Sequence, residues 1–473
     1  MGVGDVNSTL RVLPESSPGR GRIFGYPRPS IWLTVPGGRA AAATRRTYRT
    51  KKANKGDTLS KIPIRTIQLA TAIGAAALTV AACSSSPSTS AAGASSISSS
   101  TIVVGGMAPL TSQVLTQPEI EAGIVAAVDA LNAQGGIDGH HVKLDYCDTQ
   151  YTSSGEISCM DQMISNKVSA LIAPSIAASA TGSPFELSQA ADLASIGGLG
   201  EIVPELTSPA VFPLAGGDPG WVYGAMADLV KGGARRIAVL GNAIGSYEAV
   251  KSYALAALKQ AGLTPVNVSE GDPNSDPTFA AAAAKAVSGN IDGMYLAVSP
   301  NNVPIAVRAV RAAGYTGPIA SIAAAFTPPI IKALGSQGNG IELSGNVAFP
   351  SQTGNPAVTA YLADMAKYQP QGTIDQLSET SWAGMMLFAK AMKGQTNFSA
   401  SHVLSVMKNL STPIDLGVTG PYAVKNSVSP IPGFPSIHNP TITLGVLQDG
   451  VIKPQSGPTF VNPVQVLNAA SHG

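Results

Sequence analysis

The stretch that decides the fold is residues 101–139, which read TIVVGGMAPLTSQVLTQPEIEAGIVAAVDALNAQGGIDG. Its first part, 101–105, is a short β-branched run ended by glycine, which is typical of a buried strand. After a polar loop, apolar residues recur at the three- and four-residue spacing of a helix: Ile120, Ile124, Val128 and Leu131. Two glycines at 135–136 then end the helix. The segment therefore predicts one βα unit.

The same unit recurs along the chain. Further strands are expected at 142–146, 170–173, 236–240 and 292–298, and further helices at 155–167, 183–194, 246–261 and 303–313. Strands that alternate with helices predict parallel sheets covered on both faces. About 360 residues are too many for one core, so we expect two sheets, with ligands bound at the carboxyl ends of their strands. The proline-rich segment 413–463 is expected to wrap over these units rather than add another.

Length and composition are those of a folded protein with more than one domain. The chain has 473 residues, 44% of them hydrophobic and 12% charged, which excludes a disordered, highly charged chain. Charge is divided unevenly: residues 1–82 carry 13 Lys+Arg and 3 Asp+Glu, which leaves 17 and 25 for residues 83–473. Because the larger part is mildly acidic, we expect no binding to nucleic acid.

An uncharged, alanine-rich run occupies residues 67–82. Its 16 residues fall short of the roughly 20 that span a bilayer, and basic residues precede it, so a secretory signal peptide is predicted at 59–82. The sequence Val80-Ala81-Ala82-Cys83 resembles the lipobox of bacterial lipoproteins. This likeness implies that the Cys83 sulfur carries a diacylglycerol and that two or more acyl chains anchor the protein.

The segments on either side of this run have no apolar period. Residues 83–100 are rich in Ser and Ala and are expected to be a flexible tether. Residues 1–58 are rich in Arg, Pro and Gly, and we expect a non-native extension or a disordered segment there. The alternative for the apolar run that ends at Cys83 is a buried N-terminal helix that ends in an ordinary cysteine.

Motifs for catalysis, metal binding and cofactor binding are missing from the sequence. It has no Gly-x-Ser-x-Gly, no His-Glu-x-x-His, no phosphate-binding loop ending in Gly-Lys-Ser/Thr and no Cys-x-x-Cys. We therefore expect no enzyme, no metal site and no cofactor. The neighbours His140 and His141 are interpreted as a solvated turn, because a metal site needs three or four convergent ligands. Secretion permits a disulfide between Cys147 and Cys159, and the alternative is two unpaired buried thiols.

Four segments of the body together resemble one known family. They are NAQGGIDG at 132–139, APLT at 108–111, PELT at 204–207 and VRAAGY at 310–315. In order and spacing they resemble the solute-binding proteins of the branched-chain amino-acid class (Leu/Ile/Val-binding, periplasmic binding protein type 1), which are the extracytoplasmic receptors of ATP-driven importers. The resemblance covers nearly all of 101–463, and a pair like Cys147 and Cys159 recurs in relatives of this class.

The resemblance implies an α/β fold of two Rossmann-like lobes, each a parallel sheet flanked by helices, joined by three hinge crossovers around a ligand cleft. The implied boundaries are 101–217 plus 346–425 for lobe 1, 218–343 plus 426–463 for lobe 2, and a flexible C-terminus at 464–473. The implied protein is a monomer, lipid-anchored at the outer face of the cytoplasmic membrane or in the periplasm. It closes on a small-molecule ligand and delivers that ligand to ABC permease subunits in the membrane.

Two other functions are weighed against import. A ligand-sensing receptor of the same fold, feeding a signalling partner, is the alternative. A secreted enzyme is the weakest reading, because the expected cleft has few titratable groups and no pair of nucleophile and base.

The family's ligand-binding positions fall on loops that open helices. Carried over residue by residue, they are Thr111, Ser112, Thr116, Ala177, Ala178, Ser179, Gly200, Glu201 and Ile202 in lobe 1, and Ser246, Tyr247, Ser299, Ala323 and Phe326 in lobe 2. The alternative role for the loop serines is helix capping, and for Tyr247 it is packing at the rim.

Two of these positions depart from the family's pattern. Amino-acid binders of this class carry an aromatic residue where Ser299 stands, and where Ala323 stands they carry an acid that pairs with the ligand's ammonium. A buried ammonium without a partner is costly. We therefore expect a neutral or anionic, amino-acid-like, amide or organic-acid ligand, with Glu201 as the residue able to replace the lost acid.

Overall fold

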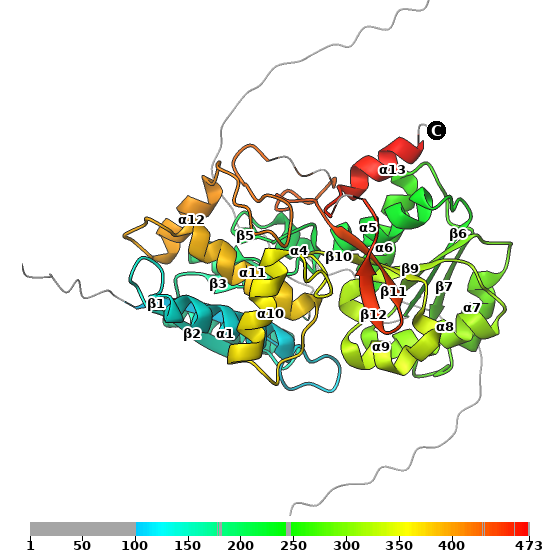
Figure 1. Cartoon of the computed structure of the whole chain (residues 1–473), viewed down its shortest axis with the longest axis horizontal. Coiled ribbons are helices and arrows are strands. Elements are labelled where there is room, and N and C mark those ends of the chain that lie inside the picture. The colour runs from blue at the N-terminus through cyan, green and yellow to red at the C-terminus, as the bar shows by residue number, and fades with distance from the viewer. Residues whose placement is uncertain are drawn as a thin grey trace, which may run out of the picture. The chain divides into compact units, whose positions relative to one another are not determined.

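The computed structural model describes residues 101–471 except 177, 179–181, 243–246, 428, 430 and 458. They form two largely parallel sheets with helices packed on them, so the predicted α/β class with two lobes is confirmed (Figure 1). The predicted extension 1–58, signal peptide 59–82 and tether 83–100, with the lipidation residue Cys83, lie outside the described residues. In the part of the chain that is described, no helix has both the length and the apolar character to cross a membrane.

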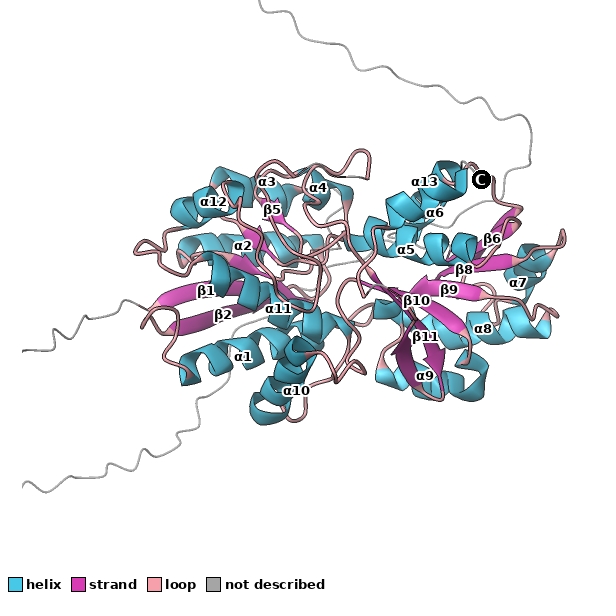
Figure 2. Cartoon of the chain, turned by 45° about the horizontal axis from the view of Figure 1, so that its top comes forward, coloured by secondary structure: helices cyan, strands magenta, loops and turns pink. Residues whose placement is uncertain are grey.

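Lobe 1 is built on a five-stranded parallel sheet in the order β2-β1-β3-β4-β5. The strands are β1 (Ile102–Ala108), β2 (Val142–Asp148), β3 (Leu171–Ile172), β4 (Ser195–Ile196) and β5 (Val211–Phe212). The helices are α1 (Pro118–Ala133), α2 (Ser153–Ser165), α3 (Ser183–Ala190), α4 (Val203–Thr207), α10 (Pro356–Tyr368), α11 (Gln376–Ala391) and α12 (Ala400–Lys408). Figure 2 shows the strands β1 and β2 beside α1 and α11.

The segment 132–139 joins α1 to β2 through its own side chains and glycines. Asn132 donates from Nδ2 to the carbonyl oxygen of Val142 (2.8 Å) and accepts from the Val142 N–H (2.8 Å), so it holds the first residue of β2. At Gly136, with φ +76°, an added Cβ would lie 2.0 Å from the His140 carbonyl oxygen. Only glycine fits this turn, which accounts for the motif in physical terms.

Lobe 2 is built on a seven-stranded sheet in the order β12-β11-β10-β9-β8-β6-β7. The parallel strands are β6 (Ile237–Asn242), β7 (Asn267–Gly271), β8 (Gly293–Ala297), β9 (Ile319–Ile322) and β10 (Ile341–Gly345), and the antiparallel pair is β11 (Thr443–Gln448) and β12 (Val451–Pro454). The α-helices are α5 (Gly217–Lys231), α6 (Tyr247–Gln260), α7 (Ala280–Val287), α8 (Val303–Ala312), α9 (Pro328–Leu334) and α13 (Pro463–Ser471). Short 3₁₀ turns are η1 (Pro300–Asn302), η2 (Ala323–Ala325) and η3 (Gly335–Gly338).

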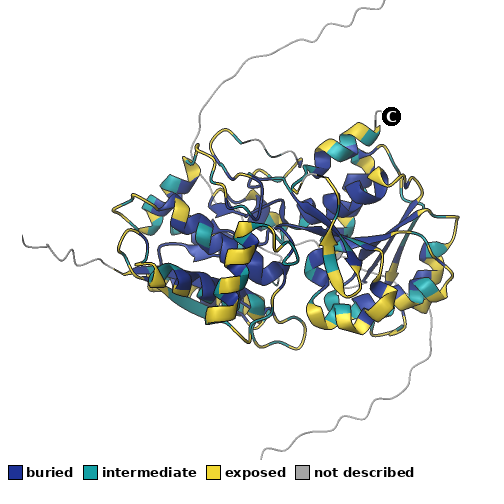
Figure 3. Ribbon diagram, viewed as in Figure 1, coloured by how far each residue is buried: buried dark blue, intermediate teal, exposed yellow. Residues whose placement is uncertain are grey.

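The central helices of the two lobes are α11 and α5. Buried residues occupy nearly the whole length of both, as the dark ribbon in Figure 3 shows. In lobe 1, Gly123 of α1 meets α11 so closely that an added Cβ would lie 2.2 Å from the Ser378 carbonyl oxygen. Each sheet therefore has its own hydrophobic core, as the length of the chain predicts.

The repeated strands and helices predicted from periodicity are present with ends shifted by a few residues. The proline-rich tail is confirmed as a segment that adds no βα unit, because β11 and β12 form a hairpin that pairs with β10. Cys147 at the end of β2 and Cys159 in α2 form the expected disulfide.

The expectation of a flexible C-terminus over 464–473 is corrected by the structure. Residues Pro463–Ser471 form α13, whose Val464 and Leu467 are buried against the core that contains α5 and α6. The physical reason is that proline at the first helical position favours a helix start, and that Val464 and Leu467 stand at helical spacing.

The chain passes between the lobes three times: after β5, after β10 and before β11. Asn439, in the third passage, is 2% exposed and donates from Nδ2 to the Leu214 carbonyl oxygen in the first passage (3.2 Å) and to Thr419 Oγ1 (2.8 Å). Gln376 at the start of α11 donates from Nε2 to the Val347 carbonyl oxygen in the second passage (3.3 Å). These side chains tie the crossing segments to each other and to lobe 1.

Candidate functional site

A cavity of about 320 Å³ lies among the loops that follow strands of both sheets. Its walls in lobe 1 are Ser112–Gln117, Glu119, Tyr151, Leu199, Glu201, Ile202 and Leu377. Its walls in lobe 2 are Asp218, Trp221, Val250, Ser299–Asn301, Ile322, Ala324, Ala325 and Thr327. Loops at the carboxyl ends of parallel strands are where α/β proteins bind ligands.

Two glycines bring carboxyl groups from the two sides of the first passage together. The Asp218 N–H donates to the Gly200 carbonyl oxygen (2.9 Å). Gly217, with φ +62°, packs on the same backbone, since an added Cβ would lie 2.7 Å from the Gly200 oxygen. Glu201 and Asp218 directly follow these glycines, and both line the cavity.

Burial controls the protonation of these carboxyl groups. Burial and, to a smaller extent, Glu156 raise the pKa of Glu201 to about 7. Burial and the charge of Glu201 raise the pKa of Glu205 to about 8, although Glu205 accepts the N–H groups of Gly200 and Glu201. Burial, followed by Glu201 and Glu205, raises the pKa of Asp218 well above its ordinary value. Among the described residues that line the cavity there is no Lys, Arg or His.

The hydrogen bonds of Glu201 are consistent with a protonated carboxyl. The Ser175 hydroxyl oxygen lies 2.6 Å from Gln117 Oε1 and 2.8 Å from Glu201 Oε2. A hydroxyl has one proton and can donate to only one of two acceptors. All three groups are satisfied when Ser175 donates to Gln117 and a protonated Glu201 donates to Ser175.

Three further lining side chains have hydrogen-bonding capacity that no described residue uses. The Trp221 indole Nε1 has no hydrogen-bond partner among the described residues, although the side chain is 2% exposed and lines the cavity. Glu119 Oε2 is likewise buried and unpartnered within the described part of the chain. Ser299 Oγ accepts from Asn242 Nδ2 (2.9 Å) and Asn302 Nδ2 (3.0 Å), which leaves its own proton to donate.

The structure places five of the predicted ligand-binding residues on the cavity wall: Ser112, Thr116, Glu201, Ile202 and Ser299. Three others have different surroundings. Thr111 bonds through its N–H and hydroxyl to Asp148, at the end of β2. The backbone of Gly200 packs against that of Gly217. The Ala178 N–H donates to Glu156 Oε1 (2.8 Å). Ala177, Ser179 and Ser246 lie outside the described residues, and Tyr247 is the first residue of α6.

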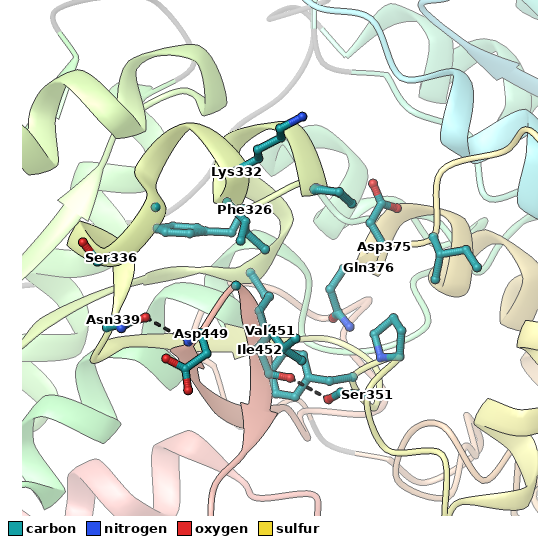
Figure 4. A pocket seen from close by; sticks show the side chains of 18 residues that line it. Phe326, Lys332, Ser336, Asn339, Ser351, Asp375, Gln376, Asp449, Val451 and Ile452 are labelled. Carbon is teal, nitrogen blue, oxygen red and sulfur yellow. Dashed lines mark hydrogen bonds between the residues drawn. The ribbon is translucent and has the colours of Figure 1, made fainter.

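Ala323 and Phe326 line a second pocket instead of this cavity (Figure 4). That pocket measures about 600 Å³ and lies between α9, the turn after β11 and the start of α11. In and beside the 3₁₀ turn η2, Ala324 and Ala325 line the cavity, whereas Ala323 and Phe326 line the second pocket.

Sequence reasoning missed Glu119, Asp218 and Trp221. Glu119 stands in the first turn of α1, beside the residues that form the core stripe. Asp218 and Trp221 lie one helical turn apart in α5, just after the first passage between lobes. The signal for them was the sequence Gly216-Gly217-Asp218-Pro219-Gly220-Trp221, in which an acid and a large aromatic residue follow a glycine pair at the predicted lobe boundary.

A metal ion has no obvious place among the described residues, since no group of three or more His, Cys, Asp and Glu side chains there is arranged to hold one. The cavity instead offers carboxyl groups, an indole N–H and a serine hydroxyl. Such a wall suits an organic molecule that is held by a few directed polar contacts and enclosed by apolar surface.

Comparison with solved structures shows the same fold at low sequence identity. A possible leucine/isoleucine/valine-binding protein of Rhodopirellula baltica is 15% identical, with 77% of this chain and 98% of that chain covered and a TM-score of 0.64. A substrate-binding periplasmic protein of Ralstonia solanacearum is 19% identical, with 75% and 100% covered and a TM-score of 0.63. A branched-chain amino acid transporter substrate binding protein of Streptococcus pneumoniae, in complex with isoleucine, is 16% identical, with 77% and 100% covered and a TM-score of 0.59.

Comparison with curated proteins finds none that matches. A family model described as periplasmic binding protein matches residues 101–427, which include both sheets apart from the final hairpin. The sequence segments, the two lobes and the cavity between their strand ends agree with this match. The chain belongs to the periplasmic binding protein family, with the type 1 fold of the branched-chain amino-acid-binding proteins.

Proposed function

We propose that this protein is the extracytoplasmic solute-binding lipoprotein of an ABC importer, which captures a small molecule by hinge closure and presents it to a permease. The observation that carries the proposal is the cavity of about 320 Å³ whose walls come from both lobes. A ligand there contacts both lobes at once, and these contacts are complete only when the lobes are closed. Such a ligand stabilises the closed state by its difference in affinity for the two states.

The crossing segments are suited to a hinge. They are tied to one another by a few hydrogen bonds, such as those of Asn439, instead of by a continuous sheet. Closure therefore requires backbone rotation in short segments while each lobe keeps its own core. A permease that contacts both lobes distinguishes the closed form from the open one. Anchoring through Cys83 keeps the protein at the membrane surface, where the permease lies.

The test is ligand-dependent compaction of the purified protein. A thermal-shift screen of small metabolites identifies binders, and at about 100 times Kd a ligand is expected to add about 2.7 kcal/mol of stability. Small-angle X-ray scattering of the same samples should then show a smaller radius of gyration with ligand. A saturating ligand that leaves the scattering profile unchanged contradicts hinge closure, and turnover of that ligand contradicts the binding role.

A pair of variants localises the effect to the cavity. Ala324→Trp fills the cavity from its lobe 2 wall and should abolish both the thermal shift and the compaction. Ala313→Trp adds the same side chain at an exposed position at the end of α8 and should leave both unchanged. Equal binding by the two variants would show that the ligand binds elsewhere.

A further inference from the structure

We propose that the ligand is a small organic cation, an amine that also carries a hydroxyl or another neutral acceptor and has no carboxylate. This inference rests on the solute-binding function proposed above and names the ligand class of that site. It differs from the neutral or anionic ligand expected from Ala323, because carboxyl groups line the cavity from other positions.

The first argument is the charge of the cavity wall. Carboxyl groups reach it from three elements: Glu119 on α1, Glu201 after β4 and Asp218 on α5. No described lining residue is cationic, and no salt bridge with Lys or Arg is formed by these three carboxyl groups in the described part of the chain. A ligand ammonium can pair with one of these carboxyl groups once that group has lost its proton, whereas a ligand carboxylate brings a negative charge that no cationic lining residue offsets.

The second argument is independent of charge and concerns Trp221. Its Nε1–H is an obligate donor, it is buried without a partner among the described residues, and it lies on the cavity wall. A buried donor without an acceptor costs stability, so a ligand oxygen placed there gains that free energy. Ser299 can donate a second hydrogen bond from the lobe 2 side. The ligand therefore needs a neutral acceptor in addition to its ammonium group.

Protonation of the carboxyl groups that line the cavity should make binding of a cation depend on pH. The titratable groups that face Glu201 and Asp218 are Glu156 from α2, Glu205 from α4 and Tyr253 from α6, and no Lys, Arg or His among the described residues is a cause of their raised pKa values. A cation binds the ionised carboxylate, so protons must leave before or during binding. A carboxyl with a pKa of about 7 is about 9% ionised at pH 6 and about 91% at pH 8. Apparent affinity for a cation should rise about tenfold over this range.

The experiment uses four compounds with one carbon skeleton and different charge. Leucinol carries an ammonium and a hydroxyl, leucine is a zwitterion, 4-methylpentanamide is neutral, and 4-methylpentanoate is an anion. Their Kd values for the full chain are measured by isothermal titration calorimetry at pH 6 and pH 8, where the leucinol amine stays protonated. We expect leucinol to bind tightest and its Kd to fall about tenfold from pH 6 to pH 8.

Variants test whether the carboxyl groups are responsible. Asp218→Asn and Glu201→Gln should each weaken leucinol binding about tenfold or more. Glu186→Gln changes an exposed acid on α3 and should leave the Kd unchanged. Because Glu201→Gln also changes a buried carboxyl that is hydrogen-bonded to Ser175, the thermal stability of this variant is measured alongside its affinity. The ligand series on the unaltered protein tests the proposal even where a variant does not fold.

The outcomes separate this inference from the proposed function. Leucine, the amide or the anion binding tighter than leucinol, or no leucinol binding at millimolar concentration, overturns the cation proposal. Compaction by one of those other compounds in the same samples leaves the solute-binding function standing. Leucinol binding with the expected pH dependence but without compaction supports the cation site and counts against hinge closure.

Discussion

The contact between Gly197 and Gly384 should be one of the least tolerant points in lobe 1. Gly197 directly follows β4, has φ +75°, and donates its N–H to the Phe212 carbonyl oxygen (2.9 Å), so its backbone is fixed in the sheet. An added Cβ would lie 2.3 Å from the Gly384 Cα of α11. The obstacle is backbone in the middle of a buried helix, which has no side chain to rotate away.

The cost of Gly197→Ala has two parts. Placing alanine in the left-handed region costs about 1–2 kcal/mol, and forcing a methyl group into a packed helix contact costs about 1–3 kcal/mol. We therefore expect the free energy of unfolding to fall by about 2–5 kcal/mol. The measurement is urea denaturation, followed by circular dichroism, of the purified variant and the unaltered chain.

Gly394→Ala is the matched control for this substitution. Gly394 lies in the same lobe with φ +80°, but an added Cβ there meets nothing within 4 Å. The free energy of unfolding of this variant should fall only by the cost of alanine in the left-handed region, about 1–2 kcal/mol. Equal losses of stability in the two variants would show that the end of β4 does not pack closely on α11. The chain would then leave β4 toward Glu201 by a different path.

Three further predictions follow from individual groups. Replacing Cys147 and Cys159 by alanine should lower the free energy of unfolding by about 3 kcal/mol, because the disulfide closes a loop over 12 residues; an oxidised wild type no more stable than the double variant contradicts this. Burial raises the pKa of Glu205 to about 8, so the protonated carboxyl contributes fully to the free energy of unfolding below about pH 4.5, and this contribution is lost as the pH rises toward 8. A melting temperature that is higher at pH 8 than at pH 5.5 would contradict this prediction. Burial lowers the pKa of His438 to about 4, so the neutral imidazole contributes to the free energy of unfolding above pH 6.5, and this contribution is lost as the pH falls toward 4. In thermal melts, His438→Phe should therefore lose less stability than the wild type between pH 6.5 and pH 4.

The elements that could be predicted are those in which local sequence and tertiary structure agree. The stripe Ile120, Ile124 and Val128 is buried on α1 as its spacing indicates. The segment 132–139 could be recognised because one turn requires both Asn132 and Gly136, and their contacts are with residues nearby in the sequence. Such features depend on contacts within about ten residues, which a sequence shows directly.

The ligand wall is harder to predict because it depends on contacts between distant segments. This chain has alanine at position 323, where the resembling family has an acid, and the carboxyl on the lobe 2 wall comes from Asp218, more than a hundred residues earlier in the chain. Its place beside Glu201 follows from the approach of Gly200 to Gly217, which no periodicity reveals. The division of the 3₁₀ turn η2 between the two pockets is likewise not visible in the sequence, because its three residues are all alanine.

In the function proposed above, Asp218 is the residue that links recognition of a cation to movement of the lobes. Asp218 begins α5 at the end of the first passage, and its N–H donates to Gly200 in lobe 1. A cation held between Asp218 and Glu201 therefore binds at a crossing segment, where a small rotation moves a whole lobe. Ionisation of these carboxyls without a ligand increases their mutual repulsion, and a bound cation removes it. We propose that binding of a cation to the ionised pair supplies the differential affinity that the proposed hinge closure requires.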